Sequence, residues 1–208
     1  EALACSEYQT GKTVLSSLPS VVTYALTTYC YTGADICVIC DRVTRPASAD
    51  SSATEEAIAA VTPLLQTAMT VLLHCGGEAM FSPHFDRVIA LIKPPTRVMF
   101  ATNAMALTPR RAQHMLERDI MTRIIISLDA ATPELFRIMR PACDLETISR
   151  NVTHYVKCAR QLKRDAAAII LNMTVCQTNL ADVPKLVDLA VELGANGVEY
   201  NHLNATKS

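Results

Sequence analysis

The sequence predicts an α/β fold: a partial (β/α)6, TIM-like barrel built from parallel strands. Short β-rich runs alternate five times with segments of helical periodicity, and a sixth strand follows them. The strand runs are almost continuously apolar, which is typical of a parallel sheet covered by helices. Half of the 208 residues are hydrophobic, enough for one sizeable core. Because a closed barrel needs more of these units, we expect a barrel with one open side.

The pattern assigns each element in order. Six strands are expected, at 21–28, 70–75, 97–102, 122–128, 167–175 and 197–201. Five helices are expected between them, at 54–68, 83–92, 108–118, 144–164 and 181–193, with a short extra helix opening at 132–134. Thr108-Pro109 and Asp182 are typical helix starts, and Gly194 is a typical helix stop.

One domain is predicted, over residues 21–208, preceded by an N-terminal preamble at 1–20. The chain ends directly after the sixth strand, where the pattern requires another helix. We therefore expect that it has been truncated there.

Composition argues against several classes of partner. The 19 basic residues balance 20 acidic ones, so we expect no broad surface for nucleic acid or anionic membranes. The longest apolar runs are too short to span a bilayer. Only three of the eight cysteines have ligand spacing, and the chain is too long to need a disulfide framework. A reducing, cytoplasmic location is therefore expected.

The unusual residues lie at or just after the ends of the predicted strands, except for Asn172, which lies within the fifth strand. In order along the chain they are Cys30 to Cys40, Gly76 to Glu78, Asn103, Ser127 with Asp129, Asn172, and Asn201 with His202. Because the carboxyl ends of parallel strands share one rim, we expect these residues to converge on a single site.

Three cysteines, Cys30, Cys37 and Cys40, follow the first strand. Thiolates bind iron–sulfur clusters or zinc, and three of them leave one metal position open for a small molecule. A redox Cys-x-x-Cys pair is less favoured because a third cysteine precedes it. Zinc would require a fourth ligand, for which His74 and Cys75 are the candidates.

Four segments in this order resemble the radical S-adenosylmethionine (radical SAM) enzymes: TTYC…CVIC, HCGGEAM, ATNAMAL and ISLDAATPELFRIMR. The resemblance covers residues 10–205. It implies that Cys30, Cys37 and Cys40 hold a 4Fe-4S cluster whose fourth iron binds S-adenosylmethionine. It also implies reductive cleavage of this cofactor to a 5′-deoxyadenosyl radical, which abstracts hydrogen from the substrate.

The same resemblance implies roles for the remaining rim residues. Gly76, Gly77 and Glu78 would hold the amino group of the methionine moiety. Ser127 and Asp129 would contact the ribose or the carboxylate of S-adenosylmethionine. The alternative is that these two residues only form a capping turn after the strand. The other two implied cofactor residues are Arg140, which would pair with the carboxylate or else be a surface arginine, and Asn103 of the TNA segment.

Several features of the sequence depart from the family pattern, among them Ala104 in place of a glycine. Six residues, rather than three, separate Cys30 from Cys37. Ile39 stands where an aromatic residue is common, and Ala79 replaces a proline. The longer first loop is easily accommodated at Gly33.

Within the family, the TNA and SLDAATPELF segments most resemble enzymes that carry a cysteine-rich SPASM/twitch C-terminal extension, which this chain does not contain. The expected substrates are then peptides or small metabolites, with methyl transfer as a rival reaction. A reductant such as flavodoxin or ferredoxin is the implied partner. Two alternatives stay open: a zinc-stabilised barrel that binds a ligand without radical chemistry, and an inactive scaffold.

Overall fold

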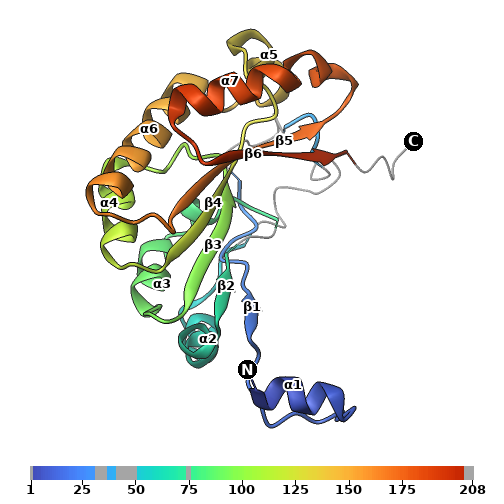
Figure 1. Cartoon of the computed structure of the whole chain (residues 1–208), viewed down its shortest axis with the longest axis vertical. Coiled ribbons are helices and arrows are strands. Elements are labelled where there is room, and N and C mark those ends of the chain that lie inside the picture. Colours follow the sequence, from blue (N-terminus) through green and yellow to red (C-terminus); the bar gives the residue numbers. More distant parts are fainter. Residues whose placement is uncertain (1, 31–36, 41–50, 74–75, 204–208) are drawn as a thin grey trace.

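A single parallel sheet forms the centre of the protein, as a computed structural model describes it for residues 2–30, 37–40, 51–73 and 76–203. The six strands lie in sequence order, each parallel to its neighbours. They are β1 (Val21–Thr23), β2 (Thr70–Leu72), β3 (Arg97–Thr102), β4 (Met121–Ser127), β5 (Ala168–Val175) and β6 (Gly197–His202). The sheet curves without closing (Figure 1), which confirms the predicted partial barrel.

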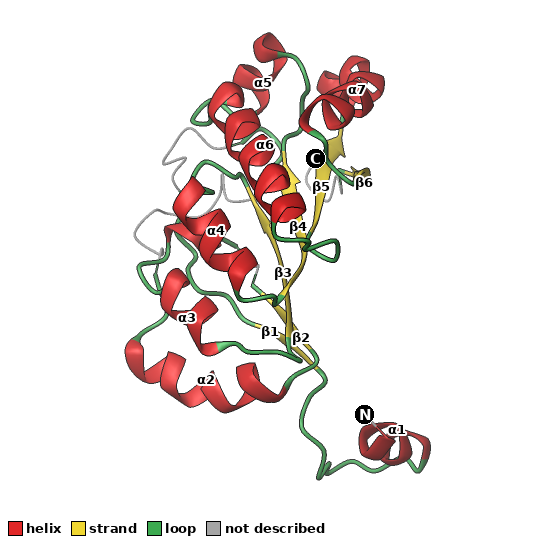
Figure 2. Ribbon diagram, turned by 60° about the vertical axis from the view of Figure 1, so that its left-hand side comes forward, coloured by secondary structure: helices red, strands yellow, loops and turns green. Residues whose placement is uncertain are grey.

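Helices cover the convex face of this sheet and leave the concave face without helical cover (Figures 1 and 2). They are α2 (Glu55–Thr67), α3 (Phe85–Leu91), α4 (Pro109–Glu117), α5 (Pro133–Met139), α6 (Leu145–Gln161) and α7 (Val183–Leu193), with short 3-10 turns η3 (Ala79–Phe81) and η4 (Gln177–Asp182). The extra helix predicted after Thr132 is therefore α5.

Alternating burial along the strands separates the two faces. In β3, Val98 and Phe100 are fully buried towards the helices, whereas Met99 and Ala101 are only partly buried on the other face. Phe100 meets Phe85 of α3 edge to face, with ring centroids 5.6 Å apart. The core thus lies between sheet and helices, and the concave side is free to hold a site.

The first strand is shorter than the predicted 21–28. After Thr23 the backbone turns away from the sheet: the Thr28 amide donates to Ser51 O, and Thr27 forms an isolated antiparallel bridge with Ser52. The apolar pattern continues to Leu26, which is buried, so the sequence overestimated the strand although it placed the core residue correctly. The second strand ends at Leu72, and residues 74–75 lie outside the described residues.

All three predicted helix signals stand where they were expected: α4 begins after Thr108, and α7 begins after Asp182 and ends at Gly194. The Thr108 hydroxyl accepts a hydrogen bond from Arg111 N at the start of α4, and Gly194 ends α7 with φ 70°. Asp182 is the residue before α7, but its carboxylate makes no capping hydrogen bond to that helix and instead accepts hydrogen bonds from Ala131 N and Thr132 N. These bonds tie η4 to the turn that follows β4.

The expected preamble contains a helix, α1 (Ala2–Gln9), set apart from the sheet (Figure 1). Glu7 is buried by the turn that follows it and accepts hydrogen bonds from Ser16 N and Ser17 N. No helix among the described residues is long and apolar enough to cross a membrane.

Candidate functional site

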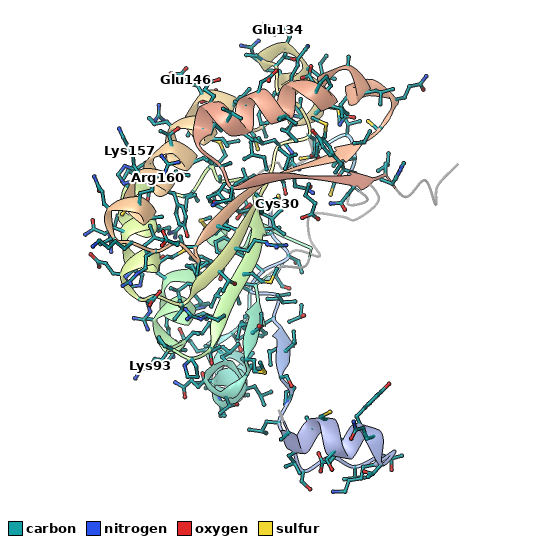
Figure 3. The ribbon with its side chains drawn as sticks, viewed as in Figure 1. Cys30, Lys93, Glu134, Glu146, Lys157 and Arg160 are labelled. Carbon is teal, nitrogen blue, oxygen red and sulfur yellow. The ribbon has the colours of Figure 1, made fainter. Side chains whose placement is uncertain are left out.

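The carboxyl ends of the strands enclose a cavity of about 290 Å³ on the concave side. It is lined by Cys30, Cys37, Gly76, Gly77, Glu78, Ala101, Thr102, Asn103, Ser127 and Arg140. All but Ala101 and Thr102 belong to the predicted site. Cys30 lies on this inner side, whereas the labelled Lys93, Glu146 and Lys157 project from the outer surface (Figure 3). A larger cleft of about 550 Å³ between α3 and α4 holds none of the predicted residues.

Gly77 brings two of the predicted segments into direct backbone contact. A Cβ atom at this position would lie 2.4 Å from Thr27 O and 2.6 Å from Tyr29 O, closer than any side chain can approach. The next residue continues the contact, because Glu78 N donates to Tyr29 O at 2.9 Å. Glycine at position 77 therefore lets the GlyGlyGlu loop pack directly against the segment that leads into Cys30.

Glu78 is buried, with 3 % of its surface exposed, and its carboxylate is engaged by the protein itself. One oxygen accepts from Thr102 Oγ1 at 2.7 Å and Met80 N at 3.3 Å, and the other accepts from Asn103 N at 2.7 Å. Burial raises the pKa of this carboxyl, and the hydrogen bonds from Asn103 and Thr102 oppose that shift. In this structure Glu78 fixes the loop after β2 to the end of β3.

We expect Glu78→Gln to destabilise the fold by about 1–3 kcal/mol. The amide nitrogen of glutamine would face one of the buried donors now bound by carboxylate, and that donor would lose its partner. The free energy of unfolding from urea titration measures the effect. Glu192→Gln, at an exposed position on α7, is the matched control and should change stability little. Unchanged stability in Glu78→Gln would show that the carboxylate does not hold the loop.

Asp129 and Arg140 form a buried ion pair at the end of β4. Asp129 is fully buried, and one of its oxygens accepts from Arg140 Nε at 2.7 Å and contacts Arg140 Nη2. The other oxygen accepts from Thr174 N at 2.8 Å, just inside the end of β5. Asp129 thus joins the ends of β4 and β5 to the end of α5, and it is absent from the cavity lining. Arg140 lines the cavity and is not a surface arginine.

Cys37 and Cys40 lie on a turn that is held by the end of α5. Cys40 N donates to Cys37 O at 2.8 Å, and Val38 N donates to Met139 O at 3.1 Å. Met139 directly precedes Arg140, so the Asp129–Arg140 pair and the anchor of the cysteine turn share one helix end. Residues 31–36, between Cys30 and Cys37, lie outside the described residues.

Cys30 and Cys40 both lie within electrostatic reach of Cys37. Burial is the largest cause of the raised pKa of the Cys37 thiol, Arg140 opposes it, and Cys30 and Cys40 add to it. Arg140 places a positive charge beside Cys37, which favours the thiolate form that metals bind.

No three described His, Cys, Asp or Glu side chains converge on one point as a single bound metal ion would require. A 4Fe-4S cluster does not need such convergence, because each cysteine ligates a different iron. By their chemistry, the three thiols, two of which line the cavity, are donors of the kind that such a cluster takes. His74 and Cys75, the predicted fourth zinc ligands, lie outside the described residues.

Asn103 and Ser127 line the cavity. Asn103 is buried and its side-chain oxygen accepts from Met105 N at 2.9 Å, which shapes the turn after β3. Asn172 is buried on β5, in register with Ser127. Asn201 and His202 lie exposed at the end of β6, outside the cavity lining.

Sequence reasoning missed three contributors to the site. Thr102 bonds Glu78, and Asn179 donates to Asp129 O at 2.8 Å. Cys143, which has no ligand spacing in the sequence, is buried within electrostatic range of Cys37, and burial raises its pKa to about 12. Of these three residues, only Thr102 could have been found from the sequence, because it is a polar residue at the end of a predicted strand.

Solved structures with a similar fold include those of SuiB and anSMEcpe. SuiB of Streptococcus suis bound to S-adenosylmethionine superposes with a TM-score of 0.68 at 14% identity, over 100% of this chain and 45% of that chain. SuiB bound to the precursor peptide SuiA superposes with a TM-score of 0.66 at 15% identity, over 98% of this chain and 43% of that chain. The structure of anSMEcpe with bound AdoMet (S-adenosylmethionine) and Cp18Cys peptide superposes with a TM-score of 0.65 at 14% identity, over 90% of this chain and 51% of that chain.

The chain therefore spans about half the length of these structures or somewhat less. No family model and no curated protein matches its sequence. At this level of identity the likeness establishes the fold, and the chemistry has to be argued from the residues.

Proposed function

We propose that this chain, which has the partial barrel fold of the radical SAM enzymes, is a member of that superfamily and binds S-adenosylmethionine at a 4Fe-4S cluster. One observation carries the proposal. The cavity at the strand ends is lined jointly by Cys30, Cys37 and the GlyGlyGlu loop, and Gly77 packs that loop against the cysteine segment. A cluster and a cofactor bound to its open iron require this adjacency.

Each part of the cavity then has a distinct task. Cys30, Cys37 and Cys40 would hold the cluster. When bound, the cluster would supply the electron that cleaves S-adenosylmethionine and so starts hydrogen abstraction from the substrate. The loop at 76–78 would present backbone groups to the methionine end of the cofactor, because the Glu78 carboxylate is already occupied by Thr102 and Asn103.

The polar wall would orient the rest of the cofactor. Ser127 lies in the lining and is available to the ribose or carboxylate. Arg140 also lines the cavity, and its bond to Asp129 fixes the direction of its guanidinium. In our proposal Asp129 acts through Arg140 and does not touch the cofactor, which refines the role implied by resemblance.

A peptide or small-metabolite substrate fits the open concave side. The structures similar to this chain include SuiB with a precursor peptide and anSMEcpe with a bound peptide. The reductant, the cytoplasmic location and the absence of nucleic-acid or membrane partners remain predictions from the sequence.

The decisive experiment is anaerobic reconstitution with iron and sulfide, followed by reduction with dithionite. The electron paramagnetic resonance spectrum is then recorded with and without S-adenosylmethionine, and 5′-deoxyadenosine is assayed by chromatography. A reduced-cluster signal that changes on adding the cofactor, together with that product, supports the proposal. Zinc in place of iron would favour the ligand-binding barrel, and a cluster without cofactor cleavage would favour the inactive scaffold.

Cys37→Ala is expected to prevent stable cluster assembly while leaving the fold intact, because it removes one of only three ligands. The measurements are iron content, the reduced-cluster signal and far-UV circular dichroism. Cys5→Ala is the matched control: it removes an exposed thiol on α1 and should keep all three. Full iron content in Cys37→Ala would show that this cysteine is not a ligand.

A further inference from the structure

The polar lining of the cavity continues across the sheet to its open edge. The strand registers place Ser127 beside Asn172, and Asn172 beside Glu199. Thr174 and Asn201 form the next pair towards the strand ends. The row below, Ile125, Ile170 and Gly197, is apolar. A band of hydrogen-bonding side chains therefore runs from the cavity wall on β4 to the edge strand β6.

Glu199 points to the concave side. Its neighbour Tyr200 donates its hydroxyl to Val183 O of α7, at 2.6 Å, and Val198 packs against the core. Both therefore face the helices. Because side chains alternate along a strand, Glu199 and Asn201 face the opposite, uncovered side. Figure 1 shows no helix over β6 on that side.

The Glu199 carboxylate has no cationic partner among the described residues. Its one side-chain hydrogen bond comes from Asn201 Nδ2 at 3.4 Å. The backbone is also engaged, since Asn172 Nδ2 donates to Glu199 O at 3.4 Å. Arg140, the cation of the cavity, is committed to Asp129. The half-buried Glu199 carboxylate at the mouth of the barrel can therefore accept further hydrogen bonds.

We infer that Glu199, with Asn172 and Asn201 beside it, forms a substrate-binding subsite for a cationic group, an ammonium or a guanidinium. This inference rests on the proposed function and deepens it, because it assigns the β5–β6 half of the concave face to the substrate and the β2–β4 half to the cofactor. The apolar row at Ile125 and Ile170 would pack against the aliphatic stem that carries the charge.

The test measures binding of matched pentapeptides to the anaerobically reconstituted, S-adenosylmethionine-loaded protein by titration calorimetry. The probes are Gly-Gly-X-Gly-Gly peptides with lysine, norleucine or glutamate at X. Wild type should bind the lysine peptide about threefold to fivefold more tightly than the norleucine peptide, the range of a partly exposed ion pair. Glu199→Gln should abolish this preference, and Glu199→Lys should reverse it towards the glutamate peptide. Glu192→Gln, on the outer face of α7, should keep it.

Four results would overturn the inference. Two concern the wild type: no preference for the lysine peptide, or no measurable binding of either peptide at millimolar concentration. Two concern Glu199→Gln: a lysine preference that survives, or weakened S-adenosylmethionine binding. The last result would assign Glu199 to the cofactor. The proposed function fails separately. A lysine preference without 5′-deoxyadenosine formation would contradict the proposed radical reaction and leave the subsite supported. Cofactor cleavage without a lysine preference would contradict the subsite and leave the radical reaction supported.

Discussion

Asp129→Asn is expected to lower the free energy of unfolding by about 3–5 kcal/mol, the usual cost of removing one partner of a buried ion pair. Asparagine keeps the shape of the side chain and tolerates the left-handed backbone at this position, where φ is 61°. The loss therefore comes from charge: Arg140, only 11 % exposed, would keep its positive charge with no carboxylate beside it. Urea denaturation followed by circular dichroism measures the change.

Asp119→Asn provides a closely matched control. Asp119 also has a left-handed backbone, with φ 54°, and also pairs with arginines, Arg97 and Arg164. Its side chain is half exposed, so water replaces the lost contacts and the expected change is below about 1 kcal/mol. Equal losses in the two variants would mean that the backbone conformation, and not the buried charge pair, determines the effect.

The same substitution tests how the ion pair supports the proposed cluster. Met139 O, one residue before Arg140, accepts the hydrogen bond from Val38 N in the cysteine turn. If the pair holds this helix end in place, Asp129→Asn should reconstitute with less iron than wild type even where the protein is still folded. Full iron content at reduced stability would limit the pair to a structural role.

Periodicity made the fold predictable. Nearly continuous apolar runs such as IIIS at 124–127 specify buried strands, and their alternation with amphipathic helices leaves few topologies other than a wound parallel sheet. The position of the site followed from the same pattern, because the carboxyl ends of such strands share one rim. Cys30, Gly77 and Ser127 meet in one cavity for that reason.

The roles within the site were not predictable to the same degree. Glu78 and Asp129 are polar residues that follow strands. The sequence alone cannot distinguish a side chain that is free to bind a ligand from one that accepts hydrogen bonds from backbone amides elsewhere in the chain. That choice depends on contacts 25 and 45 residues away, with Asn103 and Thr174. Asp182 was correctly predicted as a helix start, but its bonding partners were not predictable, since they lie in the turn after β4.

Gly77→Ala is expected to displace the loop after β2 and to destabilise the protein by about 1–3 kcal/mol, the usual cost of forcing an extra methyl group into a packed site. All three atoms nearest to the added Cβ belong to the backbone, at Thr27, Thr28 and Tyr29. A backbone cannot swing aside as a flexible side chain can. The hydrogen bond from Glu78 N to Tyr29 O would therefore lengthen or break, and Cys30 would move with it.

Gly197→Ala separates this contact from the general effect of replacing glycine. Its added Cβ would lie 3.5 Å from Ile170 Cδ1, an ordinary packing distance, and alanine in a strand loses less backbone entropy than glycine. Stability should stay level or rise slightly. If the GlyGlyGlu loop and the cysteine segment form one unit, Gly77→Ala alone should lose iron and S-adenosylmethionine binding together. Retained iron with weakened cofactor binding would show instead that the loop serves the cofactor and that Cys30 is positioned independently of it.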